Sequence, residues 1–175
     1  GFLEKLAAAG CTQIFMGVES MNPLNLVEAH KKQNRVSEYK ALWDRCHELE
    51  LLVHVGYIIG FPHDTPASVA RDIEELRRMG ADHASFFMLT LLPGSEDHVR
   101  AYVDGVTMNP DLNIRDSFHP VFEHPLMSQA EWVATYKRAW RQFYTAEHMS
   151  RALKRCKSPA QRRHLARNGA WYIWS

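Results

Sequence analysis

Short apolar runs alternate with amphipathic segments along the first half of the chain. Three runs have the composition of strands: residues 13–18 (QIFMGV), 51–59 (LLVHVGYII) and 84–89 (ASFFML). The second run is interrupted only by His54 and Gly56, a pattern typical of a strand buried on both faces of a parallel sheet. The pattern therefore predicts three buried strands.

Helices are predicted between and before these strands, because apolar positions at helical spacing are bounded by capping residues and breakers. They begin near Phe2, Asn22-Pro23, Ser37 and Thr65-Pro66, and the first and last of them end at Gly10 and Gly80. The connections between strands are too long for hairpins, which favours parallel β/α units. About three such units predict an α/β fold that forms part of a parallel (β/α) barrel of the TIM type.

The C-terminal third has a different character. Residues 109–127 are rich in Pro, Asn and His with little periodicity, and we interpret them as an ordered connection. Ser128 and Glu131 form a capping box for a long helix that continues to Glu147, and a last helix begins near Ser158. The expected organisation is a partial barrel over residues 1–108, a connection over 109–127 and a helical extension over 128–175.

Charge sets the extension apart from the rest of a chain of 175 residues with a formal net charge of +1. Residues 1–131 hold 11 Lys and Arg against 19 Asp and Glu, whereas residues 132–175 hold 10 against 1. These cations either form solvated helix faces or contact an anionic partner. Because the sequence has no RNA-binding or helix-turn-helix signature, we do not expect a nucleic acid.

Composition and cysteine spacing favour a reduced, cytoplasmic protein. No apolar run approaches the roughly 18–20 residues that span a bilayer. Cys11, Cys46 and Cys156 are 35 and 110 residues apart, which matches no zinc-ligand spacing and leaves one thiol unpaired if a disulfide forms. The chain begins with Gly1 in a segment that is already helical, so we expect it to be cut from a longer protein.

In β/α barrels the reactive groups lie on the loops that follow the strands. This rule selects residues 19–21, 60–64 and 90–94 as candidate site segments. Glu19 follows its strand directly, where a carboxylate either accepts hydrogen bonds from a ligand hydroxyl or ammonium or caps the next helix. Gly56 and Gly60 either allow a flat ligand such as a purine to approach the backbone or mark a bulge.

Other polar groups near these segments have structural alternatives. His63 and Asp64 can form an acid/base pair, but we favour a role for Asp64 in the helix cap at Thr65. The Lys31-Lys32 pair can bind a carboxylate or phosphate, or remain solvated. His119 and His124 are each followed by Pro, and for them we favour structural hydrogen bonds over a metal site.

Four motifs resemble the second half of the radical S-adenosylmethionine (radical SAM) barrel: MGVESMNP, HKKQN, GYIIGFPHDT and LTLLPGS. The segments DLNIRDSFHPVFEHPLMSQAEW and FYTAEHM are similar to the region after the barrel in the subgroup whose longer members carry a cobalamin-binding domain. The resemblance covers residues 1 to about 150. It implies an enzyme that acts on a small organic substrate.

In that superfamily a 4Fe-4S cluster held by a CxxxCxxC loop cleaves SAM reductively to a 5′-deoxyadenosyl radical. The present sequence has no CxxxCxxC, so the resemblance places the cluster ligands upstream of residue 1, in the missing N-terminal half of the barrel. It further implies a reductant such as ferredoxin or flavodoxin, and cobalamin as a cofactor of the parent chain.

The resemblance also implies roles for individual residues. Glu19 and Ser20 match a polar position that contacts the SAM ribose or amino acid. Lys31 matches a basic residue that binds the SAM carboxylate in some relatives. Backbone contacts to adenine fall to the GxIxG residues Gly56, Ile58 and Gly60, and to Leu89 and Leu91. Some relatives place a ribose-binding carboxylate where this chain has Gly56, so that contact is not expected here.

Two other classes remain open on the sequence alone. A phosphate-handling (β/α) barrel would use the helix N-termini at Pro23 and Pro66. A non-catalytic docking module would use the basic extension and the aromatic helix over residues 132–143. Independently of class, three parallel strands leave an unpaired edge, which predicts that the 175-residue chain alone is poorly soluble or oligomeric.

Overall fold

A three-stranded parallel sheet lies at the centre of the computed structural model, which describes residues 1–31 and 33–174. The strands are β1 (Gln13–Glu19), β2 (Leu52–Ile59) and β3 (His83–Met88), in the order β1-β2-β3. Each predicted strand is confirmed to within one residue at each end. The α/β class and the parallel pairing are therefore as the sequence predicts.

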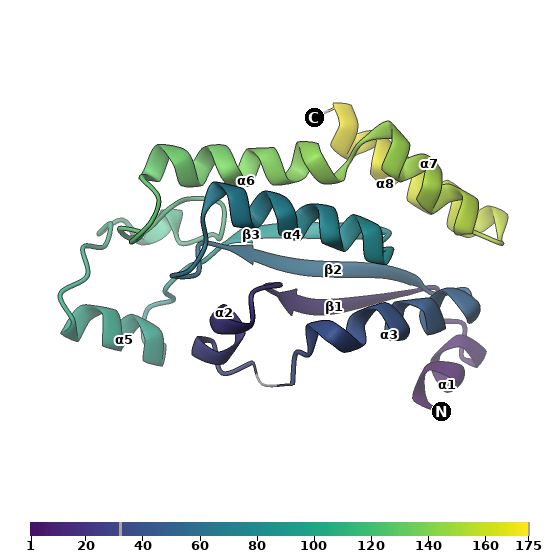
Figure 1. Ribbon diagram of the computed structural model, residues 1–175, viewed down its shortest axis with the longest axis horizontal. Coiled ribbons are helices and arrows are strands. Elements are labelled where there is room, and N and C mark those ends of the chain that lie inside the picture. The colour runs from purple at the N-terminus through teal and green to yellow at the C-terminus, as the bar shows by residue number, and fades with distance from the viewer. Residues whose placement is uncertain (32, 175) are drawn as a thin grey trace.

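Helices surround this sheet on several sides, as Figure 1 shows. Their bounds are α1 (Phe2–Ala8), α2 (Pro23–Glu28), α3 (Val36–Glu48), α4 (Pro66–Met79), α5 (Glu96–Val103), the short 3₁₀ helix η1 (Leu112–Ile114), α6 (Gln129–Phe143), α7 (Ala146–Arg155) and α8 (Pro159–Trp174). Helix α4 begins at the predicted cap Thr65, which forms a capping box with Ser68, and α6 begins at the predicted capping box of Ser128 and Glu131. None of the described helices is long and apolar enough to cross a membrane.

Helix α5 was not predicted, because it lacks an apolar stripe facing the core. Among its residues only Ala101 is buried, while Val99, Tyr102 and Val103 are exposed. Ser95 begins it by accepting a hydrogen bond from the His98 amide. This local cap is the signal from which α5 could have been found.

The prediction of one helix continuing to Glu147 is wrong. The helix ends at Phe143, and Thr145 begins α7 by accepting a hydrogen bond from the His148 amide. Between them, the buried Tyr144 hydroxyl donates to the Ala84 carbonyl at 2.7 Å and accepts from the Ala84 amide at 3.1 Å. The break thus ties the chain to the backbone of β3.

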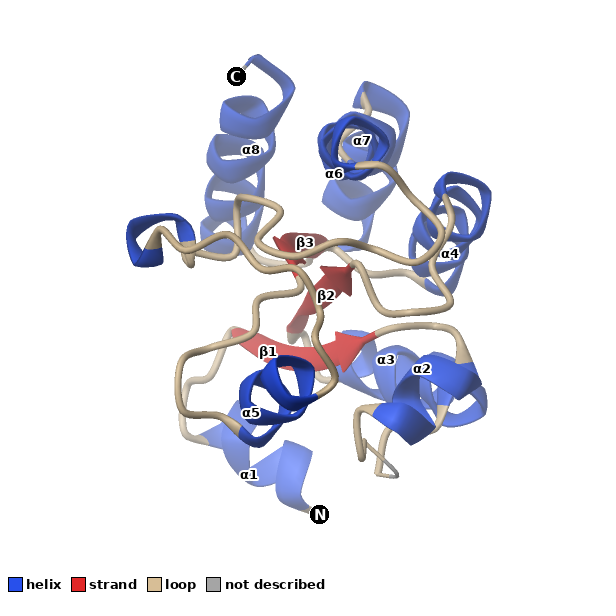
Figure 2. Cartoon of the chain, turned by 90° about the vertical axis from the view of Figure 1, so that its left-hand side faces the viewer, coloured by secondary structure: helices blue, strands red, loops and turns tan. Residues whose placement is uncertain are grey.

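The two faces of the sheet differ in their surroundings. Val53, Val55, Tyr57 and Ile59 of β2 are fully buried on the face covered by helices. Figure 2 shows α3, α4 and α6 arranged around that side of the sheet. The helix-covered face therefore carries the hydrophobic core.

The opposite face is only partly covered. Phe15 is 57% exposed, and Ile58 and Phe87 are half-buried. Helix α8 contacts the amino-terminal end of this face, where the Gln161 amide group donates to the Glu50 carbonyl and His164 lies 3.3 Å from Gln13. In Figure 1 the strands point left, toward α5 and the connection, while α7 and α8 lie at the right.

The connection over residues 109–127 is held by backbone contacts. Met108 and Phe122 form an isolated antiparallel bridge, and the Met88 amide donates to the Ser117 carbonyl at 2.7 Å. Val121 and Phe122 are buried. These contacts fix the connection against the carboxyl end of β3.

Candidate functional site

The carboxyl end of β1 brings two of the predicted site residues together. Glu19 has a left-handed φ of 65°, and the pairing register shifts between Gly17 and Glu19. A Cβ on Gly17 would lie 2.7 Å from Glu19 Oε1, so the glycine makes room for the carboxylate. Lys31 Nζ lies 3.2 Å from the same oxygen. Lys32 lies outside the described residues.

Ser20 follows in the same loop, and its side chain is fully buried. Its hydroxyl accepts hydrogen bonds from the Asn22 amide at 3.1 Å and from Asn25 Nδ2 at 3.2 Å. The hydroxyl is therefore engaged within the loop. The role of Ser20 in ligand binding stays a prediction.

Asp64 joins this loop to the one that follows β2. Its buried carboxylate accepts hydrogen bonds from Asn25 Nδ2 at 2.7 Å and from the Gly60 and Phe61 amides at 2.8 and 3.0 Å. Burial raises the pKa of Asp64 despite these hydrogen bonds. Sequence reasoning missed Asn25, because a polar residue in a short helix carries no distinguishing signal.

Neither role considered for the His63-Asp64 pair fits this geometry. The His63 ring lies 3.0 Å from Glu28, on the surface, whereas Asp64 is buried and binds backbone amides. The cap of α4 is Thr65, whose side chain accepts from the Ser68 amide. Asp64 instead accepts from the Gly60 and Phe61 amides, in the turn before the helix. The prediction that Asp64 takes part in the cap of α4 is therefore wrong, because that cap is formed by the side chain of Thr65.

A second carboxylate lies behind this turn. Tyr57 Oη donates to Asp72 Oδ2 at 2.6 Å. Burial and the neighbouring Asp64 raise the pKa of Asp72 to about 6, although the hydrogen bond from Tyr57 lowers it. The loops at the ends of β1 and β2 thus rest on a buried polar network.

Aromatic rings fill the space beside both glycines of the GxIxG motif. A Cβ on Gly56 would lie 2.8 Å from Cζ of Phe15, so the ring crosses the backbone there. Gly60 has a φ of 118°, and a Cβ on it would overlap the Trp132 indole. Ile58, between them, is half-buried on the less covered face of the sheet.

The end of β3 lies beside the end of β2. The Leu89 amide donates to the Ile59 carbonyl at 2.9 Å, and Arg115 donates to the Leu91 carbonyl at 2.6 Å. Leu89 and Leu91 are both half-buried. Arg115 was missed, because nothing in the sequence indicates a contact that reaches back across 24 residues.

The histidines of the connection have structural partners, as we favoured. His119 Nδ1 lies 3.0 Å from both oxygens of Asp116. His124 Nε2 donates to the Phe61 carbonyl at 2.9 Å, while its Nδ1 accepts from the Leu126 amide. Within residues 1–31 and 33–174, no three His, Cys, Asp or Glu side chains are grouped to hold a metal ion.

Cys11, Cys46 and Cys156 are free thiols. Cys46 and Cys156 are buried, and burial raises the pKa of each thiol. A metal cluster needs thiolates. Within residues 1–31 and 33–174, none of the three cysteines is grouped with two other His, Cys, Asp or Glu side chains.

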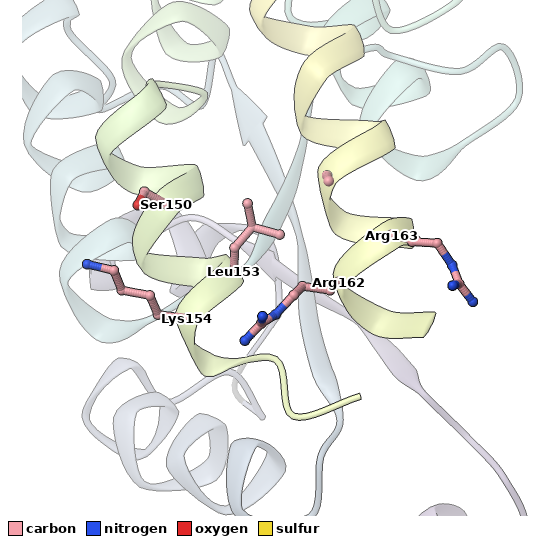
Figure 3. Close-up of a pocket in the computed structure, with 6 residues that line it drawn as sticks. Ser150, Leu153, Lys154, Arg162 and Arg163 are labelled. Carbon is pink, nitrogen blue, oxygen red and sulfur yellow. The ribbon is translucent and has the colours of Figure 1, made fainter. Parts of the chain in front are cut away.

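A cavity of about 500 Å³ lies between α7 and α8. Figure 1 shows these helices at the end of the sheet away from the predicted site. In Figure 3, Leu153 and Arg162 lie between the two helices, whereas Lys154 and Arg163 extend away on either side. The cations do not converge on one point, so the cavity does not enclose an anion.

No protein-family model matches the chain. A search of curated proteins finds similarity to the bacteriochlorophyllide d C-12(1)-methyltransferase of Chlorobaculum tepidum. The two are 24% identical over 147 residues, which cover 81% of this chain and 30% of that protein. The chain is thus similar, over most of its own length, to less than a third of a methyltransferase.

Proposed function

We propose that the chain is part of a radical SAM (β/α) barrel and binds SAM at the carboxyl ends of β1, β2 and β3. The observation that carries the proposal is the Glu19–Lys31 pair, 3.2 Å apart, at the end of a strand beside the GxIxG strand. The similarity to a methyltransferase supports it, because SAM is the usual methyl donor of such enzymes.

The charges of this pair match those of the amino acid part of SAM. Glu19 offers a carboxylate for the ligand ammonium, and Lys31 offers an ammonium for the ligand carboxylate. The Lys31 and Glu19 side chains are 41% and 19% exposed, so both remain accessible. Binding would exchange one ion pair within the protein for two with the ligand.

The ends of β2 and β3 suit the adenine. Ile58 and Leu89 present partly exposed apolar side chains next to backbone groups, as a planar base with polar edges requires. Phe15 adds an aromatic ring over Gly56 on the same face. These residues would hold the base, while the Glu19–Lys31 pair orients the other end of the ligand.

The ligands of the 4Fe-4S cluster would lie outside the described residues of this chain. Cys11, Cys46 and Cys156 are 35 and 110 residues apart in sequence, and none of them belongs to a metal-ligating group within the described residues. Reductive cleavage of SAM is the chemistry that the bound cluster supplies. Cobalamin rests on the sequence resemblance alone. Among the reactions of the superfamily we favour methyl transfer, because of the relative found.

The phosphate-binding alternative receives less support. Asn22 accepts a hydrogen bond from the Leu24 amide, and Thr65 accepts one from the Ser68 amide, so caps already use first-turn donors of α2 and α4. Each cap leaves fewer free amides for an anion at that helix start. The docking-module alternative concerns the basic extension, including the aromatic helix α6, and is compatible with SAM binding elsewhere.

Replacement of the two charged residues tests the proposal. The variants are made in the full-length protein, purified without oxygen. Glu19→Gln and Lys31→Met are each expected to weaken SAM binding about tenfold, because each loses one charge-assisted hydrogen bond. Equilibrium dialysis with labelled SAM measures the Kd. Glu28→Gln on neighbouring α2 is the matched control, since Glu28 is exposed and pairs with His63.

The proposal fails if the unmodified protein shows no saturable SAM binding. It also fails if Glu19→Gln and Lys31→Met bind SAM as tightly as the Glu28→Gln control does.

A further inference from the structure

Residues 115–132, which follow the strands, make four hydrogen bonds to the backbone predicted to bind adenine. The Trp132 indole donates to the Ile59 carbonyl at 2.9 Å, and His124 donates to the Phe61 carbonyl at 2.9 Å. Ser117 accepts from the Met88 amide, and Arg115 donates to the Leu91 carbonyl. Each contact falls on or next to a backbone position that the proposed SAM site would use.

Trp132 is the most deeply placed of these residues. It is fully buried, and its ring packs edge-on against Phe122, with centroids 5.0 Å apart, and beside His124, with centroids 5.4 Å apart. Its ring also occupies the space in which any side chain at position 60 would lie. Only glycine at position 60 therefore leaves room for the Trp132 indole beside this turn.

The hydrogen bond from Trp132 changes what the Ile59 carbonyl can do. That oxygen also accepts from the Leu89 amide at 2.9 Å, so both of its lone pairs are used within the protein. An adenine edge cannot pair with it. The ligand must use neighbouring backbone groups, whose positions depend on how Ile59 and Gly60 are held.

We propose that Trp132 is a positioning residue for adenosine recognition, fixing the end of β2 from the helix after the connection. His124 supports it at the next carbonyl, Phe61. This inference rests on the proposed function. It extends that function by giving the C-terminal segment a part in ligand binding, through its hydrogen bonds to backbone carbonyls at the ends of β2 and β3.

5′-Methylthioadenosine is the probe, because it carries the adenosine of SAM without the amino acid. In the protein as its gene encodes it, Trp132→Phe keeps an aromatic ring but removes the N–H donor. We expect it to weaken the binding of methylthioadenosine and of SAM by the same factor, about three- to tenfold, because one buried hydrogen bond is lost. A loss confined to SAM would overturn the inference, since it would point to the amino acid end.

Trp140→Phe is the matched control. Trp140 lies on the same helix and stacks on Tyr144 and Tyr172, away from the end of β2. Both substitutions remove an indole from α6, so an equal loss of nucleoside affinity in both would show a merely structural effect and overturn the inference. An unchanged affinity in Trp132→Phe would overturn it as well.

A second pair of variants keeps the test decisive if Trp132→Phe does not fold. His124→Phe removes the donor to Phe61, whereas His124→Gln retains one. We expect weaker methylthioadenosine binding in the first and recovery of most of it in the second. Equal affinities in both would contradict the inference. If the unmodified protein binds neither compound, the proposed function itself fails, a result distinct from all of these.

Discussion

Asp72 shows how a single side chain can make stability depend on pH. Its carboxyl is largely buried beneath the loops of the candidate site and accepts a hydrogen bond from Tyr57. Burial raises its pKa to about 6 from an ordinary value near 4. A raised pKa means that the folded protein holds this proton more tightly than the unfolded chain does. The stabilisation is therefore present below about pH 4 and is lost as the pH rises through about 6.

Asp72→Asn should stabilise the protein at neutral pH. The amide keeps an acceptor for Tyr57 and removes a buried charge near Asp64, so we expect a gain of about 1 kcal/mol at pH 7.5 and little or none at pH 4.5. Urea unfolding at both pH values measures it. Asp44→Asn, at an exposed position on α3, should show no such difference. A gain of equal size at both pH values would contradict the assigned pKa.

At the scale of elements, one ion pair attaches α7 to the sheet. Asp82 is fully buried, and its carboxylate binds Arg155 at 2.6 Å, His47 at 2.8 Å and the Val53 amide at 2.9 Å. Burial alone would raise the pKa of Asp82, but His47 and Arg155 outweigh it and hold that pKa below its ordinary value. The carboxylate thus stays ionised, and each partner is needed.

Arg155→Met should destabilise the fold by about 2–4 kcal/mol, because it leaves a buried charge with fewer partners. Thermal unfolding at pH 7 measures the loss. Arg151→Met, one turn earlier on α7, removes an exposed cation whose distance to Glu147 is 3.8 Å, and should change stability by less than about 0.5 kcal/mol. Similar losses in both variants would show that the Asp82 pair is not what holds α7.

The sequence was most informative where structure is decided locally. Apolar runs placed all three strands, while Thr65-Pro66 and the capping box at Ser128 placed the beginnings of α4 and α6. It was least informative where a residue acts across the chain. Nothing local indicates that Tyr144 pairs with β3 and breaks a helix, or that Trp132 contacts Ile59, 73 residues earlier.

The candidate site divides in the same way. The strand ends that carry Glu19, Ile58 and Leu89 follow from topology, and Lys31 from the resemblance. That Phe15 and Trp132 fill the spaces beside Gly56 and Gly60 does not follow, because a glycine signals close approach without naming the approaching group. Asn25 and Arg115 were missed because nothing local in the sequence indicates their contacts with Asp64 and with the Leu91 carbonyl.

On the scale of the whole molecule, β1 is an edge strand next to a partly uncovered sheet face. Among the described strands it pairs only with β2, and its Phe15 is 57% exposed. An open, apolar edge of this kind favours pairing with another chain. We therefore expect the 175-residue chain, expressed alone, to self-associate.

Light scattering after size exclusion measures this association, and Phe15→Lys should reduce it by placing a charge on the open face. Tyr102→Lys is the control, because Tyr102 is 75% exposed but belongs to helix α5 and not to a strand. A monodisperse monomer of the unmodified chain, melting in one cooperative transition, would contradict the prediction.

The contact between Trp132 and Ile59 also has a consequence for synthesis in the cell. Its two partners are separated by 73 residues, and a ribosome adds roughly 5–20 residues per second. The tryptophan is therefore made about 4–15 s after the strand end that it holds. During that interval the nascent β2 lacks the hydrogen bond from Trp132. If Trp132 positions the adenosine site as we propose, a ligand would bind only after the C-terminal helices have left the ribosome.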